Sequence, residues 1–549
     1  MKHTAHFEFW PPRIAKSLTL PETTIYDNLA ITAKKYPDKT AYEFYGGSAT
    51  YSQLLNETEK MAGYLEQECQ VKTGDRVLLL MQNSPQFLVS LFAILRVRGV
   101  VVAINPMSTT KDVQFFLEDG NIQLAFIGQE LYPKLEPLIG TTTLKTVISA
   151  TYSDYINERE ALADIPEEVQ APAKELAKTV SWISALNAAQ TPSVYTGESE
   201  DMAMIPYTSG TTGAPKGCIH TNRTVQANTT GSYHWMTMSP DTVVLTSLPL
   251  FHVTGLTHSA LNPILAGSRM IILTRWDRDY AIKAIEHFQV SHWINISTML
   301  IDFLANPQLA DYDISSLEIV GGGGATLPIA VGEKLRQRTG LDYVEGYGLS
   351  ETMSHTHFNP PNRPKLQCLG IPAFGVDARI IDPTTGEELG VEEEGELVVH
   401  APQMFKGYYN QEEETKASHM MLDGIQFFRT GDIVRMDDEG YFFIVDRVKR
   451  MINAAGFKVW PTEVESILYK HPAVQQACVV RSPDEVRGET VKALIILDPA
   501  YKGNVTSEEI IEWSKGQMAS YKYPRIVEFR DSFPTTSSGK ILWRQLQDA

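Results

Sequence analysis

The sequence predicts an α/β fold: a large N-terminal domain of layered α/β subdomains with a small β-rich subdomain, and a small α+β C-terminal domain. Three observations lead to this expectation. The chain has 549 residues, too many for one core at about 150 residues per domain. Apolar strand patterns alternate with helix patterns up to about residue 340. Short alternating strands follow from about Gly370, and the end of the chain returns to a mixed pattern.

The first of these patterns is a strand–helix–strand unit. Thr50 and Gln53 have the spacing of a capping box and predict the start of a helix. Arg76–Met81 is a nearly continuous apolar run, as in a parallel strand covered on both faces. Ser84-Pro85 then predicts a helix start, and Val100–Ile104 predicts the next strand. This unit therefore predicts a parallel sheet layered with helices.

Three later regions continue or change this pattern. The α/β pattern recurs with strands at Val243–Ser247, Met270–Leu273 and Leu317–Val320, and helices at Tyr280–Phe288 and Leu327–Arg338. From about 370 to 446, glycine turns separate the strands Ala378–Ile381, Gly395–His400 and Tyr441–Val445, which predict the β-rich subdomain. The C-terminal region predicts helices at Pro461–Tyr469 and Ser507–Met518, and strands at Ala473–Arg481 and Val491–Leu497.

The charge balance narrows the classes of function. There are 48 basic and 66 acidic residues, which give a formal net charge of −18. Because this charge repels phosphate backbones and anionic lipid headgroups, we expect no nucleic-acid binding and no polybasic membrane binding. The N-terminus carries no secretory signal pattern, and the most apolar stretch, Phe87–Ile104, contains Arg96 and Arg98. We therefore expect no transmembrane segment.

The number and spacing of the cysteines indicate the cellular compartment. The four of them are far apart and form no C-x-x-C pair: Cys69, Cys218, Cys368 and Cys478. This excludes a disulfide scaffold and the usual zinc spacing, and it suits a reducing cytosol, so we expect a cytoplasmic protein.

The strongest local signal is the segment Tyr207–Gly217, YTSGTTGAPKG. It follows the apolar strand pattern Met202–Ile205 and precedes a helix pattern that starts at Thr221. Its glycines let backbone N–H groups approach an anion, and its hydroxyls add uncharged donors, which together suit a triphosphate. The spacing is not that of a Walker A loop, because glycine follows Lys216. A flexible Ser/Gly linker is the alternative interpretation.

Further motifs follow this segment in order. They are Gly323-Gly324-Ala325, Tyr347-Gly348-Leu349-Ser350-Glu351, Arg429-Thr430-Gly431-Asp432, Asp446-Arg447-Val448-Lys449, Gly456 and Pro534–Leu546 (PTTSSGKILWRQL). Together with YTSGTTGAPKG they resemble the signatures of the adenylate-forming superfamily, which includes acyl-CoA synthetases, luciferases and peptide-synthetase adenylation domains. The resemblance runs from about Pro37 to the C-terminus and is greatest to bacterial-type medium- and long-chain fatty acyl-CoA ligases.

The resemblance implies an ATP-dependent acid–thiol ligase. Such an enzyme joins a carboxylic acid, here a medium- or long-chain fatty acid, to AMP with release of pyrophosphate, and then forms a thioester with coenzyme A. It implies ATP and Mg²⁺, with coenzyme A as co-substrate. It also implies an ATP- and acyl-binding domain, residues 1–448, and a mobile lid, residues 449–549. Because two half-reactions share one site, a turn of the lid about Lys449 would present Lys540 for the first and withdraw it for the second.

The chemistry of adenylation explains the two catalytic candidates. Two anions meet and charge builds on the phosphoryl oxygens, so the site needs a metal, fixed donors and a cation. Glu351 is the candidate Mg²⁺ ligand, because Mg²⁺ keeps mostly water and phosphate ligands beside few carboxylates. The alternative for Glu351 is an acid at a helix N-terminus. Lys540 is the candidate cation for the carboxylate and the α-phosphate, with a solvated surface lysine as its alternative.

The resemblance assigns the other nucleotide and thiol contacts. The phosphate contacts would be Thr208, Ser209, Gly210, Thr211, Thr212, Gly213 and Lys216. Gly321–Gly324, with Gly323 and Gly324 among the cofactor contacts, is either a plain loop or the close-approach floor of the acyl and adenine pockets, and the resemblance favours the second. The further cofactor contacts would be Ala325, Tyr347, Gly348 and Ser350. Asp432, read as lying at a turn, would accept hydrogen bonds from the ribose hydroxyls, and Arg447 would be a second ribose contact. Their alternatives are a turn-forming aspartate and a surface ion pair. Gly456 would line the thiol tunnel, and Arg450 stands where the family commonly has an acid.

The remaining candidates are three histidines and one apolar run, considered for the acyl site and for metal binding. His252 resembles the family's histidine near the acyl site, with a satisfied core histidine as the alternative. His355 and His357 lack a third ligand at a useful spacing, so they do not predict a metal site. The apolar run Ile294–Phe303 would suit an alkyl tunnel.

Other functions stay open at this point. The near ones are loading of a carrier protein, activation of an aryl or other acid, and light emission as in luciferases. A different class is a non-catalytic nucleotide- or acyl-binding protein, which would bind ATP without releasing pyrophosphate. A serine hydrolase is disfavoured because the sequence contains no G-x-S-x-G motif. A homodimer rests on analogy with relatives alone.

Overall fold

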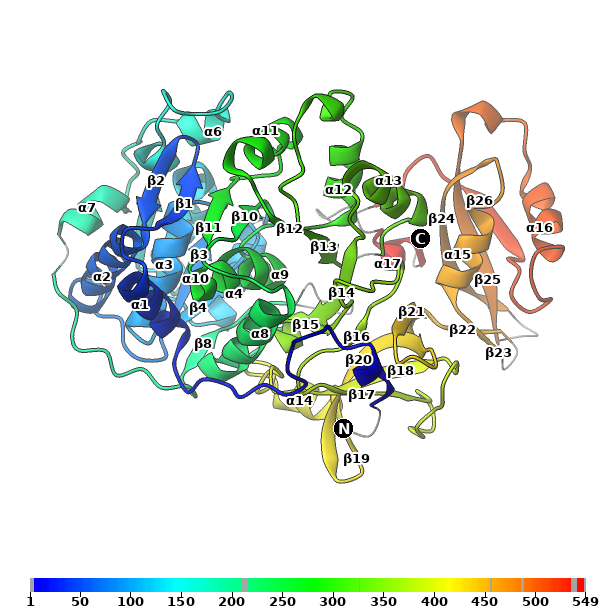
Figure 1. Ribbon diagram of the computed structural model, residues 1–549. Coiled ribbons are helices and arrows are strands. Elements are labelled where there is room, and N and C mark those ends of the chain that lie inside the picture. Colours follow the sequence, from blue (N-terminus) through cyan, green and yellow to red (C-terminus); the bar gives the residue numbers. More distant parts are fainter. Residues whose placement is uncertain are drawn as a thin grey trace. The chain divides into compact units, whose positions relative to one another are not determined.

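The computed structural model describes residues 4–188, 190–208, 215–324, 326–454, 457–484, 488–534 and 541–547. The chain divides into two compact units, which are described separately here (Figure 1). The first unit comprises Met1–Asp377, His400–His419 and Glu439–Tyr441, and the second comprises Ala378–Val399, Met420–Asp438 and Phe442–Ala549. Both units mix helices with sheets, so the predicted α/β class is confirmed.

The first unit contains a seven-stranded sheet in the order β7-β6-β5-β3-β4-β8-β9 (Figure 1). Its strands are β3 Arg76–Leu80, β4 Val100–Ala103, β5 Leu124–Gly128, β6 Thr146–Ala150, β7 Val180–Ser181, β8 Met202–Met204 and β9 His220–Thr221. All neighbours are parallel except β8 and β9. The predicted unit is present, because Ser84 caps α3 (Pro85–Arg96) between β3 and β4.

A nine-stranded sheet completes the core of the first unit, in the order β16-β15-β14-β13-β12-β10-β11-β1-β2. Its strands are β1 Thr40–Phe44, β2 Gly47–Thr50, β10 Val243–Thr246, β11 Arg269–Ile272, β12 His292–Asn295, β13 Ile319–Gly323, β14 Val344–Leu349, β15 Ser354–Phe358 and β16 Ile371–Pro372. The strands predicted from periodicity, β10, β11 and β13, lie in its parallel part. The antiparallel pair β14 and β15 carries the Glu351 motif at its turn.

Most of the longer helices of the first unit begin at a Thr, Ser or Asp residue that caps them; the two that start at Ser297 and Ile329 follow Ile296 and Pro328 and have no side-chain cap. The longer helices are α1 Ile25–Lys35, α2 Tyr51–Gln67, α3, α4 Thr110–Asp119, α8 Asn222–Trp235, α11 Arg278–Phe288, α12 Ser297–Leu304 and α13 Ile329–Thr339. The predicted capping box is present at α2, where Thr50 accepts from the Gln53 N–H and Gln53 accepts from the Thr50 N–H. Among the helices of the described residues, none is both long enough and apolar enough to cross a bilayer.

The second unit contains two five-stranded sheets. The first has the order β17-β18-β20-β19, with β21 paired to β20, and its strands are β17 Asp377–Ile381, β18 Gly395–His400, β19 His419–Leu422, β20 Ile425–Met436 and β21 Phe442–Arg447. The second has the order β23-β22-β25-β24, with β26 paired to β25. Its elements are β22 Ile452–Ala454, β23 Phe457–Val459, α15 Pro461–Leu468, β24 Val474–Asp484, β25 Gly488–Leu497, α16 Ser507–Lys515 and β26 Ile526–Phe529. The domain boundary at residues 448 and 449 stays a prediction.

Candidate active site

The residues on either side of the hydroxyl- and glycine-rich loop bond to each other. Tyr207 and Gly217 form an antiparallel bridge, the Thr208 N–H donates to the Lys216 carbonyl at 2.9 Å, and the Lys216 N–H lies 3.4 Å from Thr208 Oγ1. The predicted phosphate contacts Ser209, Gly210, Thr211, Thr212 and Gly213 lie outside the described residues. The structure therefore fixes the base of this loop directly after β8, where a phosphate loop on a parallel sheet would begin.

A second segment, Phe405–Tyr409, pairs with the chain that follows this loop. The Tyr409 N–H donates to the Gly217 carbonyl at 2.8 Å, the Ile219 N–H donates to the Gly407 carbonyl at 3.0 Å, and Cys218 forms an antiparallel bridge with Tyr408. Lys216 forms an ion pair with Glu414, and its Nζ lies 4.9 Å from the centre of the Tyr408 ring. These contacts hold Lys216 beside the segment Phe405–Tyr409.

Glu351 lies in the short 3-10 turn Ser350–Thr352 that joins β14 to β15. Its Oε1 accepts a hydrogen bond from the Tyr408 phenol at 2.8 Å, and its carbonyl accepts from the Phe405 N–H at 2.8 Å. The metal candidate and the base of the phosphate loop thus share one supporting segment, although they are more than 130 residues apart in the chain.

Side chains from other elements hold the carbonyls of this turn. His220 Nε2 donates to the Ser350 carbonyl at 2.8 Å, Asn228 Nδ2 to the Thr352 carbonyl at 3.0 Å, and Thr257 Oγ1 to the Met353 carbonyl at 3.3 Å. Burial lowers the pKa of His220 to about 4, so its ring is neutral and its single proton lies on Nε2. Its Nδ1 then accepts from the Thr224 hydroxyl at 3.1 Å. We infer that the turn is held by preformed bonds rather than shaped on binding.

Backbone strain marks the same turn. Met353 has φ 49° and Ser354 has φ 104°, in the left-handed region that favours glycine. Such conformations cost on the order of 1–3 kcal/mol each and persist only where neighbouring contacts impose them. Gly348 is required here for a close approach, because a Cβ at this position would lie 1.8 Å from the Ser354 carbonyl oxygen.

The glycine run Gly321–Gly324 is mostly strand rather than loop. Gly321 to Gly323 belong to β13, and a Cβ on Gly323 would lie 2.4 Å from the Gly346 carbonyl oxygen of β14. The close approach at Gly323 is to the neighbouring strand, and its role as the floor of a ligand pocket stays a prediction. Gly324 follows with φ 84°, while Ala325 lies outside the described residues.

Asp432 lies in a strand, so the expectation that it sits at a turn is wrong. Gly431 has φ 73° and kinks β20 without ending it, and Asp432 pairs in register with Arg447 of β21. Arg447 Nε lies 2.8 Å from Asp432 Oδ1, and the side chains are 47% and 3% exposed. The two ribose candidates are therefore brought together, with a buried carboxylate beneath a half-exposed guanidinium.

We expect Asp432→Asn to raise the KM for ATP by about tenfold with a smaller change in kcat. The amide keeps the shape of the carboxylate but is a weaker hydrogen-bond acceptor because it carries no charge. The loss of binding free energy for ATP is roughly 1.4 kcal/mol, which corresponds to a tenfold loss of affinity. Pyrophosphate release measured against ATP concentration gives both constants. Asp438→Asn, at an exposed position in the turn after β20, is the control, and an unchanged KM would exclude the ribose role for Asp432.

The hinge and lid candidates are described only in part. Lys449 lies in the 3-10 turn Val448–Arg450 after β21. Arg450 forms a buried ion pair with Glu465 of α15, so the unusual arginine at this position is neutralised within the second unit. Lys540 and Gly456 lie outside the described residues.

The histidine candidates separate into two kinds. His252 is exposed and caps the short helix α9 (Val253–Leu256), its Nδ1 accepting from the Thr254 N–H at 3.3 Å, so the core-histidine interpretation is excluded. His355 and His357 are buried, and burial lowers the pKa of His357 to about 3. Within the described part of the chain, no group of three or more His, Cys, Asp or Glu side chains is placed to hold a metal ion.

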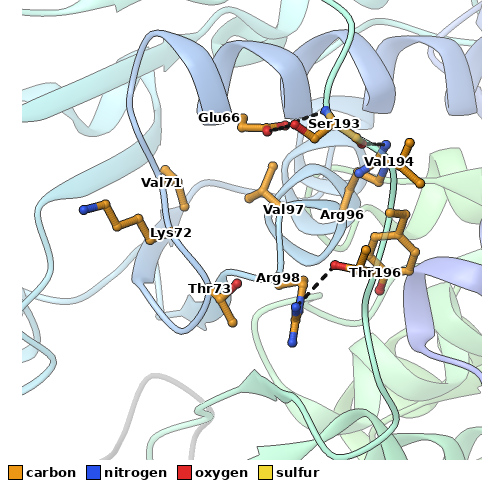
Figure 2. Close-up of a pocket in the computed structure, with 11 residues that line it drawn as sticks. Glu66, Val71, Lys72, Thr73, Arg96, Val97, Arg98, Ser193, Val194 and Thr196 are labelled. Atoms are coloured by element: carbon orange, nitrogen blue, oxygen red, sulfur yellow. Dashed lines mark hydrogen bonds between the residues drawn. The ribbon is translucent and has the colours of Figure 1, made fainter.

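Figure 2 shows a pocket of about 320 Å³ in the first unit that none of the predicted site residues lines. It lies at the ends of α2 and α3. Arg96 donates to Glu59 and to the Ser193 carbonyl, and Arg98 forms an ion pair with Asp201 at 2.8 Å. Both guanidinium charges are therefore compensated.

Sequence reasoning missed the residues that support Glu351, namely His220, Asn228, Thr257, Phe405 and Tyr408. One signal was available. The helix α8 follows the phosphate loop and carries only one residue that is charged at neutral pH, Arg223, yet its many Thr, Asn and Gln side chains are mostly buried. A long helix with a polar buried face is uncommon, and it indicates bonding to a neighbouring irregular segment.

Comparisons with known proteins agree with this geometry. Residues 29–409 match the family model described as AMP-binding enzyme, and residues 463–540 match the AMP-binding enzyme C-terminal domain. A long-chain-fatty-acid–CoA ligase of Bacillus subtilis (strain 168) is 35% identical over 549 residues, which covers 98% of this chain and 96% of the relative. A feruloyl-CoA synthase of an Amycolatopsis species is 30% identical, covering 93% of this chain and 96% of the relative. Among solved structures, o-succinylbenzoate CoA synthetase of Bacillus subtilis in complex with its acyl-adenylate intermediate has a TM-score of 0.80 and 25% identity, covering 96% of this chain and 99% of that one.

Proposed function

Because this chain belongs to the AMP-binding enzyme family and is an acid–thiol ligase, we propose that it converts a medium- or long-chain fatty acid to its CoA thioester through an acyl-adenylate. The family resemblance read from the motifs is confirmed by these matches. The observation that carries the proposal is the pairing of Gly217–Ile219, directly after the base of the loop, with the segment Phe405–Tyr409 that also bonds to Glu351. It supports a site in which residues that would bind phosphates and a metal share one supporting segment.

In the first half-reaction the acid's carboxylate oxygen attacks the α-phosphorus of ATP. A new P–O bond forms, the bond to the β-phosphate bridge breaks, and pyrophosphate leaves with the electron pair. Bound Mg²⁺ would neutralise the phosphate oxygens, and Glu351 would hold it. Thr208, Lys216 and the hydroxyls between them would bind the phosphates, Asp432 and Arg447 the ribose, and Lys540 would neutralise the charge that builds between the two anions.

In the second half-reaction the thiol sulfur of CoA attacks the acyl carbonyl of the adenylate. The thioester bond forms, the acyl–phosphate bond breaks, and AMP leaves. Lys540 has no role in this step, so a turn of residues 449–549 about Lys449 would replace it by the thiol tunnel at Gly456. His252 would act near the acyl group.

The fatty acid is supported by the name of the Bacillus subtilis ligase and by the apolar run Ile294–Phe303, which lies within β12 and α12. An aryl acid is the second candidate, because the 30% identical relative is a feruloyl-CoA synthase. The four cysteines are free thiols, three of them buried, which supports a cytoplasmic location.

The test is pyrophosphate release across a panel of acids with MgATP, with and without CoA. We expect release with C8 to C18 fatty acids, and a thioester product only when CoA is added. A thioester formed on a carrier protein but not on CoA would overturn the proposal that CoA is the acceptor. A preference for ferulate over every fatty acid would overturn the proposal that the substrate is a fatty acid. ATP binding without release of pyrophosphate for any acid would overturn the enzyme assignment.

A further inference from the structure

A phenol that belongs to none of the predicted motifs joins the two parts of the candidate site in the first unit. Tyr408 Oη donates to Glu351 Oε1 at 2.8 Å, and the ring of Tyr408 lies 4.9 Å from Lys216 Nζ. We propose that Tyr408 is a positioning residue that sets the affinity of the site for Mg²⁺ by holding the Glu351 carboxylate in one orientation. The inference rests on the proposed function, because it takes Glu351 as the metal carboxylate.

The phenol bonds directly to one oxygen of the carboxylate. Tyr408 Oη donates to Glu351 Oε1 at 2.8 Å. Hydrogen bonds that a carboxylate accepts are about twice as strong as neutral ones. The bond therefore fixes the orientation in which Glu351 would meet a cation.

Both ends of this bond are fixed before a ligand arrives. The backbone of Tyr408 pairs with Cys218, and its N–H donates to Thr415 Oγ1 at 2.8 Å. The backbone of Glu351 is held by the Phe405 N–H at 2.8 Å. Since the two main chains are already in place, the phenol orders only the carboxylate, and little conformational entropy opposes it.

The same ring also links the metal carboxylate to the phosphate loop. Lys216 Nζ lies over its face and forms an ion pair with Glu414, while the hydroxyl at its edge reaches Glu351. A cation over an aromatic face is attracted by about 0.5–2 kcal/mol. Tyr408 thus contacts both the candidate phosphate-binding lysine and the candidate metal carboxylate.

The test replaces the phenol by a ring of the same shape. In Tyr408→Phe we expect the dissociation constant of Mn²⁺, used as a paramagnetic probe for Mg²⁺, to rise by about fivefold to tenfold, as for loss of one bond to a charged group. It is measured by electron paramagnetic resonance with an ATP analogue that carries a methylene between the α- and β-phosphorus, without acid or CoA. In steady state, adenylation by Tyr408→Phe should recover to within about threefold of wild type at saturating Mg²⁺.

Tyr409→Phe is the matched control. The phenol of Tyr409, which follows Tyr408 in the chain, makes no hydrogen bond within the described residues. We therefore expect Tyr409→Phe to have the same Mn²⁺ affinity as the wild type. An unchanged Mn²⁺ affinity in Tyr408→Phe would overturn the inference, as would a loss of adenylation that excess Mg²⁺ does not restore. The Mn²⁺ titration needs no turnover, so its result can be distinguished from a failure of the proposed function. Such a failure would show as no pyrophosphate release by the wild type.

Discussion

Lys540→Ala is expected to slow acyl-adenylate formation by about 10²-fold or more, the usual loss when one donor to a transition state is removed. The lysine would stand between a carboxylate and an α-phosphate, and its compact ammonium would neutralise both as they approach. Alanine leaves this repulsion uncompensated. The rate of pyrophosphate release in a single turnover, with saturating ATP, Mg²⁺ and acid, measures the effect.

The same variant should form the thioester from supplied acyl-adenylate and CoA at the wild-type rate. A lid that alternates removes Lys540 from the site before the thiol attacks, so the second half-reaction does not need it. Lys502→Ala, which removes an exposed lysine of the second unit and its ion pair with Asp531, should leave both half-reactions unchanged. Equal losses in the two half-reactions of Lys540→Ala would contradict the alternating lid.

Glu351→Gln is expected to lower the rate of adenylation by about 10²-fold at physiological Mg²⁺, because it removes the candidate carboxylate ligand of the metal. The glutamine keeps an oxygen that accepts from Tyr408, so the turn at Ser350–Thr352 should keep its shape. A titration of pyrophosphate release with Mg²⁺ should show a half-saturation shifted upward and a partial recovery at high concentration.

A second carboxylate of the first unit provides the comparison. Glu333→Gln, on the exposed side of α13, removes the same charge at a distance from the turn and should leave the Mg²⁺ response unchanged. If Glu351→Gln showed the same Mg²⁺ half-saturation as Glu333→Gln, Glu351 would not be the metal ligand.

Elements whose determinants are close in sequence were predictable. Ser84 and Pro85 both act on the first turn of α3, and Thr50 and Gln53 satisfy each other's N–H groups, so periodicity and capping rules place these helices within a residue or two. The continuous apolar strands β3 and β4 were equally clear, because parallel strands are buried on both faces.

Features that depend on distant partners were not predictable. Nothing local to Tyr408 indicates that its hydroxyl reaches Glu351, 57 residues earlier in the chain. Asp432 was misplaced for a related reason, because the glycine before it suggested a turn, whereas pairing with β18 and β21 keeps β20 continuous through a positive φ. The family resemblance supplied most of the candidate site. The roles of all its members stay predictions, and Ser209 to Gly213, Ala325, Gly456 and Lys540 also lie outside the described residues.

The bonds that hold the carbonyls of Ser350 to Met353 have a practical meaning for redirecting the enzyme to new acids. The donors come from three separate stretches, around residues 220–228, at Thr257 and at Phe405. Combinatorial libraries that diversify those stretches should yield mostly inactive clones whatever acid is offered. Diversity placed on α12 leaves these donors untouched, and it is there that directed evolution of acyl preference should begin.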